Sequence, residues 1–146
     1  MEETQFAPEA FPAQSNAVHG IIDGVATEAT VLYFEDKILV TLSQGGSLSQ
    51  WIQVPLSAPS AASVDMALAD SNLLPLTHLT PKTMLGGGGE DRESLGQLYA
   101  VQIASHIVRR DSSEKRTLVV GLGMSKLRAE REAFFDVIEL VQKVLL

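Results

Sequence analysis

The 146-residue sequence contains no cysteine, which excludes disulfide bonds, thiolate metal sites and a cysteine nucleophile. Only 20% of the residues are charged and 5% are aromatic, whereas 45% are hydrophobic and the mean hydropathy is +0.13. This apolar content is too high for a chain that is disordered throughout. No run approaches the roughly 18 apolar residues of a membrane span. We therefore expect one soluble globular domain without a membrane segment.

Basic side chains are also scarce, with 11 Lys and Arg against 18 Asp and Glu, and the formal net charge is −7. This balance argues against nucleic-acid binding, because Lys and Arg must neutralise the phosphates. The charge is uneven, however, since residues 109–131 carry seven basic and three acidic side chains. This segment is either a solvated loop and helix start or a surface that steers an acidic protein partner, with Arg109 and Arg110 as candidate contacts.

The N-terminal residues, MEETQFAPEAFPAQ, lack the positive charge and the apolar run of a secretory signal. We therefore expect a cytoplasmic protein, with the nucleus as an additional location. Residues 1–20 show no hydrophobic periodicity and contain Pro8 and Pro12. These features predict a flexible N-terminal tail over 1–20, followed by a single domain over 21–146.

Three runs rich in Val, Ile, Thr and aromatic residues follow, at 24–34, 36–44 and 48–56. Short turn-forming pairs separate them, which predicts an antiparallel meander. Residues 57–72 are small and polar and indicate a long surface loop. Residues 73–85 form a less regular strand pattern, whose two prolines favour the edge of a sheet.

Two helices are predicted in the second half of the chain, with a strand over 115–124 between them. The first covers Asp91–Arg109, with acidic residues in its first turn and basic ones in its last. The second follows a candidate N-cap at Ser125. Its apolar positions recur at helical spacing and are Phe134, Val137, Ile138, Val141, Val144 and Leu145. This order of elements predicts an α+β domain with a mostly antiparallel sheet and two helices packed on it.

Two helices can cover only one face of such a sheet. We assign four residues to the open face, namely Val31, Tyr33, Leu39 and Trp51. A partly apolar open face is more suited to a protein partner than to water. For Trp51, the only tryptophan, a place in the core and a place as an interface anchor are both open.

The glycine run Gly86–Gly89 lies between a predicted strand and a predicted helix, where many proteins bind phosphate. A phosphate-binding loop of the type GxxxxGK[ST] needs a lysine, but Glu90 and Asp91 follow here. Two carboxylates at the start of the helix would occupy the position of the phosphate. We therefore interpret the glycines as a flexible hinge and predict no nucleotide site.

Candidate catalytic and metal-ligating residues do not converge in the sequence. His19, His78 and His106 show no metal-ligand spacing, and no GxSxG motif is present. The acidic residues of the last helix are more simply its solvated face than a catalytic pair. We therefore predict no catalytic, cofactor-binding or metal-binding residue and a protein that is not an enzyme.

Four segments carry a resemblance to a known family: Gly24-Val25-x-Thr27, ILVTLSQGG (38–46), Met84-Leu85-Gly86 and TLVVGLGMSK (117–126). In their order and spacing over about residues 20–146, they resemble the proteasome assembly chaperone 3 family. This chain departs from the family pattern in its longer N-terminal tail and in the glycines and acidic residues of 87–93.

The resemblance implies a small non-enzymatic α+β chaperone that forms a heterodimer with a similarly folded, proteasome assembly chaperone 4-like subunit. Such a heterodimer contacts 20S proteasome α-subunits, promotes α-ring formation and is then released. For the isolated chain, a monomer and a homodimer both stay open. Two alternatives stay open: a scaffold or adaptor dimer in trafficking or signalling, and a small enzyme that a ligand would stabilise.

Overall fold

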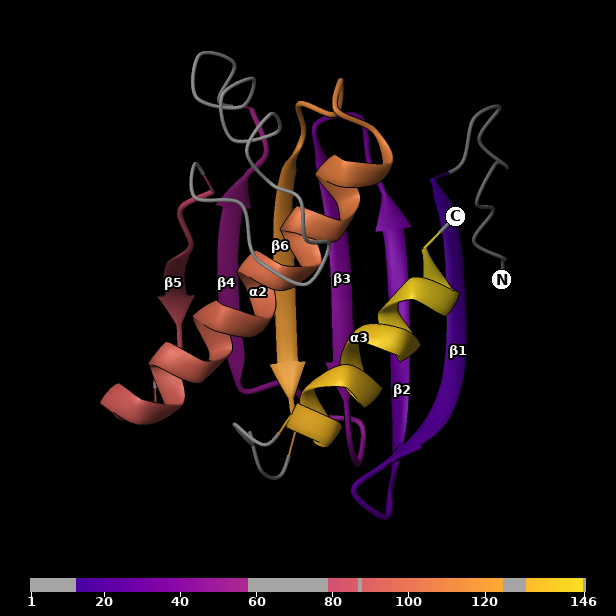
Figure 1. The fold of residues 1–146 in the computed structure, drawn as a ribbon, viewed down its shortest axis with the longest axis vertical. Coiled ribbons are helices and arrows are strands. Elements are labelled where there is room, and N and C mark those ends of the chain that lie inside the picture. The colour runs from indigo at the N-terminus through magenta and orange to yellow at the C-terminus, as the bar shows by residue number, and fades with distance from the viewer. Residues whose placement is uncertain (1–12, 58–78, 87, 125–130, 146) are drawn as a thin grey trace, which may run out of the picture.

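In the part of the chain that the structure describes, the fold is one six-stranded sheet with two helices on one of its faces (Figure 1). The computed structural model describes residues 13–57, 79–86, 88–124 and 131–145. Its elements are β1 (Gln14–Ile22), β2 (Val25–Tyr33), β3 (Lys37–Ser43), β4 (Gln50–Pro55), β5 (Lys82–Leu85), α2 (Glu90–Arg110), β6 (Thr117–Gly123) and α3 (Arg131–Val144). The predicted α+β class is confirmed.

The strand order across the sheet is β1-β2-β3-β6-β4-β5, and every pair is antiparallel except β3–β6. The predicted meander is therefore right for β2 and β3 but wrong for β4, because β6 lies between β3 and β4. Strand β6 suits this central place, since its run LVVGL is apolar on both faces. The C-terminal end of β6 therefore lies between β3 and β4, where a β3–β4 hairpin was expected. The Gln44 amide donates to Gly123 O at 3.0 Å, and the Ser49 amide donates to Leu122 O at 2.8 Å.

Strand β1 corrects the predicted tail. It pairs with β2 over its full length, from Gln14 opposite Tyr33 to Ile22 opposite Val25. A two-residue turn joins the strands, with Asp23 and Gly24 at φ of 55° and 77°, the left-handed conformation that tight hairpins require. The tail prediction is thus wrong from Gln14 onward, while residues 1–12 lie outside the described part of the chain.

The helix predictions are largely confirmed. Helix α2 extends the predicted Asp91–Arg109 by one residue at each end. The candidate N-cap Ser125 lies outside the described residues, as does most of the predicted loop over 57–72. Of the predicted strand over 73–85, residues 79–85 are described, and Lys82–Leu85 form β5. No helix in the ranges that the structure describes is both long and apolar enough to cross a bilayer.

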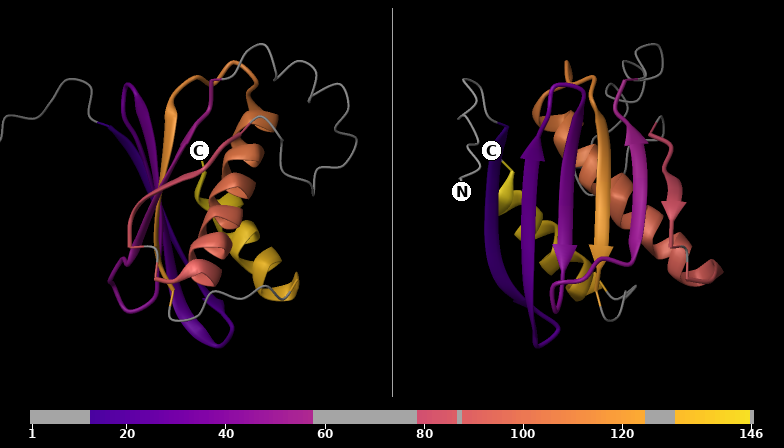
Figure 2. Two further views of the ribbon diagram at one scale, coloured as in Figure 1. Left: turned by 90° about the vertical axis from the view of Figure 1, so that its left-hand side faces the viewer. Right: turned by 180° about the vertical axis from the view of Figure 1, so that it is seen from behind.

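The hydrophobic core lies between the sheet and the two helices, which both lie on the same side of the sheet (Figure 2). From the sheet, β3 contributes Ile38, Val40 and Leu42, each no more than 1% exposed. From α3, the predicted apolar positions Val137 and Val141 are completely buried. Full burial of one such side chain contributes about 1.5–3 kcal/mol, so this layer holds the helices on the sheet.

Candidate partner-binding surface

The face of the sheet opposite the helices carries no helix in the described part of the chain (Figure 2, right). Successive side chains of a strand point to opposite faces. In β3 the buried residues therefore alternate with partly exposed ones, and Leu39 lies on this uncovered side. We call it the open face.

A row of aliphatic side chains crosses the centre of the open face. The strand register places Leu32 of β2 beside Leu39 of β3, and Leu39 beside Val119 of β6. All three side chains are half-buried. In the next row Thr30 and Thr41 lie opposite each other and form a short hydroxyl–hydroxyl hydrogen bond. The two hydroxyls of this row are therefore paired with each other, and one O–H donor of the pair is left for another partner.

Trp51 extends this apolar surface across β6. It lies opposite Gly121, where a Cβ atom would be only 3.0 Å from the indole ring and 3.3 Å from Leu48. The absence of a side chain at Gly121 thus lets the indole lie flat against the strand. On its other side Trp51 faces Leu85 of β5, which is 67% exposed. Apolar side chains therefore continue from β2 to the β5 edge.

Two pairs of polar side chains lie towards the margin of the open face. His19 Nε2 is 3.4 Å from Glu28 Oε2 across β1 and β2. At one end of β3, Lys37 Nζ is 2.9 Å from Asp36 Oδ2, and this hydrogen bond lowers the pKa of the Asp36 carboxyl. An apolar centre with charged residues at its rim is the usual composition of a protein–protein interface.

Of the four residues predicted on the open face, Leu39 and Trp51 lie there and Val31 and Tyr33 do not. Val31 is completely buried under the helices, and Tyr33, with the same parity in β2, packs against the core. The prediction is wrong for these two because β2 directs its alternate residues inward from position 27 onward. In this part of β2, it is Leu32 that points to the open face. A binding role for Leu39 and Trp51 stays a prediction.

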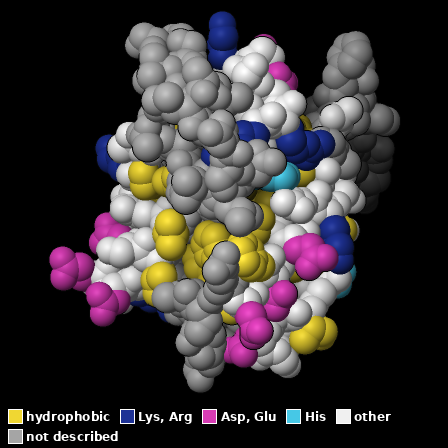
Figure 3. Space-filling model, in the orientation of Figure 1, with side chains coloured by type: hydrophobic (Ala, Val, Ile, Leu, Met, Phe, Trp, Pro, Cys, Tyr) yellow, Lys and Arg dark blue, Asp and Glu magenta, His cyan; other side chains and the backbone are white. Residues whose placement is uncertain are grey.

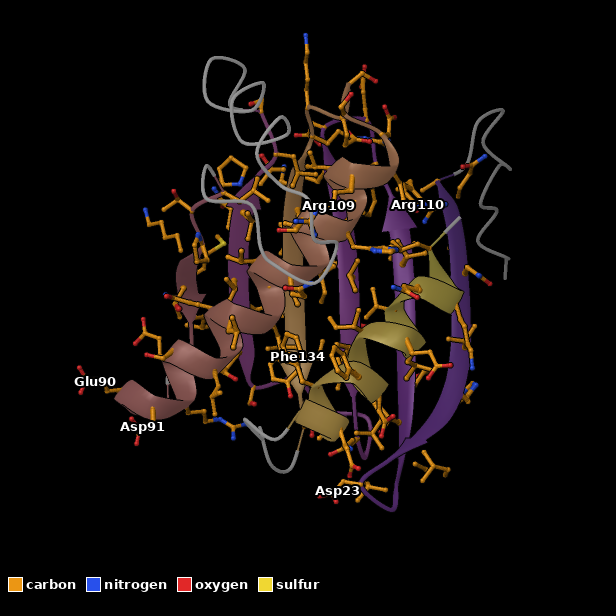
Figure 4. All side chains as sticks on the ribbon, viewed as in Figure 1. Asp23, Glu90, Asp91, Arg109, Arg110 and Phe134 are labelled. Carbon is orange, nitrogen blue, oxygen red and sulfur yellow. The ribbon has the colours of Figure 1, made fainter. Side chains whose placement is uncertain are left out.

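Arg109 and Arg110 lie at the C-terminal end of α2, in the helix layer and away from the open face (Figure 4). Partial burial lowers the pKa of the Arg109 guanidinium. Burial, together with the positive charges of Arg110 and Arg109, also lowers the pKa of His106 one turn earlier. The predicted site residues therefore divide between two separate surfaces.

Another basic residue of the 109–131 segment, Arg116, is engaged within the protein. Its Nε and Nη2 donate to the two carboxylate oxygens of Glu114, each at 2.8 Å, and its Nη1 donates to Phe34 O at 3.1 Å. The guanidinium also stacks 5.4 Å from the centre of the Tyr33 ring. These hydrogen bonds lower the pKa of Glu114 and raise that of Arg116. This arginine therefore adds little free positive charge to the surface.

A second apolar patch lies in the helix layer, between α2 and α3 (Figure 3). Tyr99 of α2 and Phe134 of α3 meet there with ring centres 4.8 Å apart, and Phe135 lies 6.5 Å from Phe134. Phe135 and Leu98 remain 39% and 43% exposed. The Tyr99–Phe134 contact makes this patch part of the packing between the two helices.

The glycine run between β5 and α2 has a geometric cause. Gly86 has a φ of 75°, and a Cβ there would lie 1.8 Å from Ser49 O, so no other residue fits. Positions 88 and 89 also have positive φ, whereas position 87 is not described. The first turn of α2 is acidic and contains Glu90, Asp91 and Glu93 (Figure 4). The turn geometry accounts for the glycines, and the hinge stays a prediction.

Leu32, Val119 and Gly121 complete the open face but are not among the residues predicted from the sequence. A signal for Val119 was present, because it alternates with the buried Leu118 and Val120. Leu32 and Gly121 depend on the register between strands, which the sequence does not display. Among the residues with described positions, no group of three His, Asp or Glu side chains could hold a metal ion.

No protein-family model matches the chain, and no curated protein matches it. A chain from a crystal structure described as a novel chaperone complex for yeast 20S proteasome assembly is similar, with a TM-score of 0.63 and 15% sequence identity. The similarity covers 89% of this chain and 97% of that chain. At this level of identity the likeness shows a shared fold over nearly the whole of both chains.

Proposed function

We propose that this protein is a non-enzymatic chaperone for assembly of the 20S proteasome core particle. It acts as a heterodimer with a similarly folded, proteasome assembly chaperone 4-like subunit. The fold shared with a chain of the yeast assembly-chaperone complex carries this proposal, because the match spans 97% of that chain. The sequence segments that resemble the proteasome assembly chaperone 3 family support the same function independently.

The open face supplies a surface for the heterodimer. Its aliphatic row and Trp51 present adjoining apolar side chains from four strands, which water solvates poorly. A second sheet packed about 10 Å away would bury them, as in other sheet-on-sheet interfaces. Trp51 is the natural anchor, since buried tryptophans often dominate binding energy.

The chaperone action follows from binding alone. The heterodimer holds 20S α-subunits, promotes α-ring formation and dissociates when later subunits compete for the same surface. The arginines at the end of α2, Arg109 and Arg110, are candidate contacts for an acidic α-subunit surface. They lie outside the open face, so the two binding events do not compete for the same residues.

The test is affinity purification of the tagged full-length protein from its source cells, followed by identification of the retained proteins. We expect a small homologous partner and 20S α-subunits, with few mature β-subunits. Recovery of neither would reject the proposal. Stable recovery of trafficking or signalling components would instead favour the adaptor hypothesis.

Two matched variants locate the heterodimer surface. Leu39→Glu places a charge at the centre of the open face and should remove the small partner. Leu98→Glu places the same charge on an exposed apolar position of α2 and should retain it. Circular dichroism must show that both variants fold. Equal retention by both would mean that the partner binds elsewhere.

A further inference from the structure

The two edges of the sheet differ in how they are protected from further strands. At one edge, β5 has only four residues, follows Pro81, begins with Lys82 and faces an irregularity in the register at Trp51/Ile52. Short length, proline, lysine and bulges are the usual devices that prevent strand addition. The β5 edge therefore has several of them.

The other edge, β1, has none of these devices. It is nine residues long, QSNAVHGII, and contains no proline and no Lys, Arg, Asp or Glu. Among the described residues, no strand pairs with its outer side. Alternate residues of an edge strand direct their N–H and C=O groups away from the sheet, so a partner segment can add to it through main-chain hydrogen bonds.

A surface pocket lies beside this edge, between β1 and α3. Asn16 Nδ2 donates to Val144 O at 3.1 Å, which holds α3 along the strand. Further along β1, Gly20 has no side chain, and a Cβ there would lie 3.0 Å from Leu140 Cδ1. Leu140 fills the space directly over this glycine, and the pocket lies beside it. The pocket is lined by His19 and Gly20 of β1 and by Asp136, Glu139 and Lys143 of α3.

Two carboxylates and one lysine line the α3 side of the pocket, so their balance is acidic and favours a basic occupant. Lys143 Nζ lies 3.9 Å from Glu139 Oε2, one turn along the helix. In the described part of the chain, Asp136 has no basic side chain within ion-pair distance. Acidic side chains also gather along α3 at the surface (Figure 3). A long basic side chain can pack its stem on Leu140 and place its charge at Asp136.

We propose that the β1 edge binds an extended segment of another protein, which adds as a seventh strand and carries a Lys or Arg whose side chain enters the pocket beside Gly20. An added strand lies about 4.8 Å from β1, and alternate side chains of it face α3. The main chain supplies affinity, and the basic anchor supplies the register and the selectivity.

Two segments of this chain, a second copy of β1 and residues 1–12, do not fit as the occupant. A second copy of β1 contains no Lys or Arg and so lacks the anchor. Residues 1–12 also contain no Lys or Arg, include Glu2, Glu3 and Glu9, and have two prolines without a backbone N–H. The pocket lies at the edge of the sheet and on its helix side, and it meets the margin of the open face at His19.

The test uses the full-length protein and a fluorescent nine-residue peptide of alternating Thr and Val with one central lysine. Fluorescence anisotropy should show saturable binding that weakens at least tenfold when glutamate replaces the lysine. Asp136→Lys should weaken binding at least tenfold. Glu132→Lys makes the same charge change on the same helix, outside the pocket, and should change the affinity less than twofold.

Amide hydrogen exchange distinguishes strand addition from simple charge attraction. Peptide binding should protect amides of β1 and leave those of β5 unchanged. No binding at millimolar peptide, equal effects of Asp136→Lys and Glu132→Lys, or protection outside β1 would overturn the proposal. Deletion of residues 1–12 should leave the affinity within twofold. A tenfold increase would show that the chain's own N-terminus occupies the edge, which would also overturn it.

Discussion

The two faces of the sheet are built from similar side chains but differ in how deeply those side chains are buried. Val119 and Val120 are neighbours in β6 and differ only in the face to which they point. Val120 is completely buried beneath the helices, whereas Val119 is half-buried on the open face. Composition therefore does not separate the core from a binding surface in this protein. The covering helices α2 and α3 separate them: the face beneath the helices forms the core, and the face that they do not cover is the open face.

The largest expected effect comes from placing a charge on each face of the sheet in turn and comparing the losses of stability. Val120→Asp buries an unpaired carboxylate and should reduce the free energy of unfolding by about 4 kcal/mol or more. Val119→Asp leaves the carboxylate in contact with water and should cost less than about 1 kcal/mol while weakening partner binding. Urea unfolding followed by circular dichroism measures both values. Similar losses of stability would mean that the open face is covered in the isolated protein.

A smaller effect tests how well the open face is packed within the chain itself. Gly121→Val inserts a side chain where the indole of Trp51 lies, with a Cβ 3.0 Å from the ring, and should cost about 1–3 kcal/mol. Trp51→Ala removes the obstacle. In the double variant the cost of Gly121→Val should therefore largely disappear, as a double-mutant cycle would show. Additive costs would contradict the contact between the two residues.

The smallest effect concerns a corner of the helix side of the sheet. Because Arg116 lowers the pKa of Glu114 in the folded protein, the pair stabilises the fold above the ordinary glutamate pKa of about 4.3. This contribution is lost as the pH falls through the lowered folded-state pKa. Glu114→Gln should therefore cost about 1 kcal/mol at pH 7 and almost nothing at pH 3. Unfolding curves from pH 7 to 3 test this, and a cost independent of pH would refute it. Partner binding should not change.

The helices were predictable because their signals are local. The spacing of Val137 and Val141 alone indicates a buried stripe, and acidic and basic ends mark the limits of α2. Strands β2 and β3 were also predictable, since a short turn joins them. The α+β class follows from these elements and from the order in which they occur.

The remaining features depend on contacts that are distant in sequence. The insertion of β6 between β3 and β4 brings residues 37–43 beside residues 117–123, and no local pattern reports this pairing. Val31 and Leu32 are both apolar, so periodicity could not decide which of them faces the helices. Strand β1 was missed because its first residues, Gln14 to Ala17, lack the β-branched side chains typical of strands. The candidate site combines several such distant pairings.

The central place of β6 also sets the order in which the protein can fold during its synthesis. β1, β2 and β3 are joined in sequence, but β4 and β5 are connected to them in the sheet only through β6. A nascent chain that has emerged as far as residue 116 therefore carries two separate groups of strands with unsatisfied inner edges. Because unpaired edges promote aggregation, protection of this intermediate would matter most just before residues 117–123 leave the ribosome.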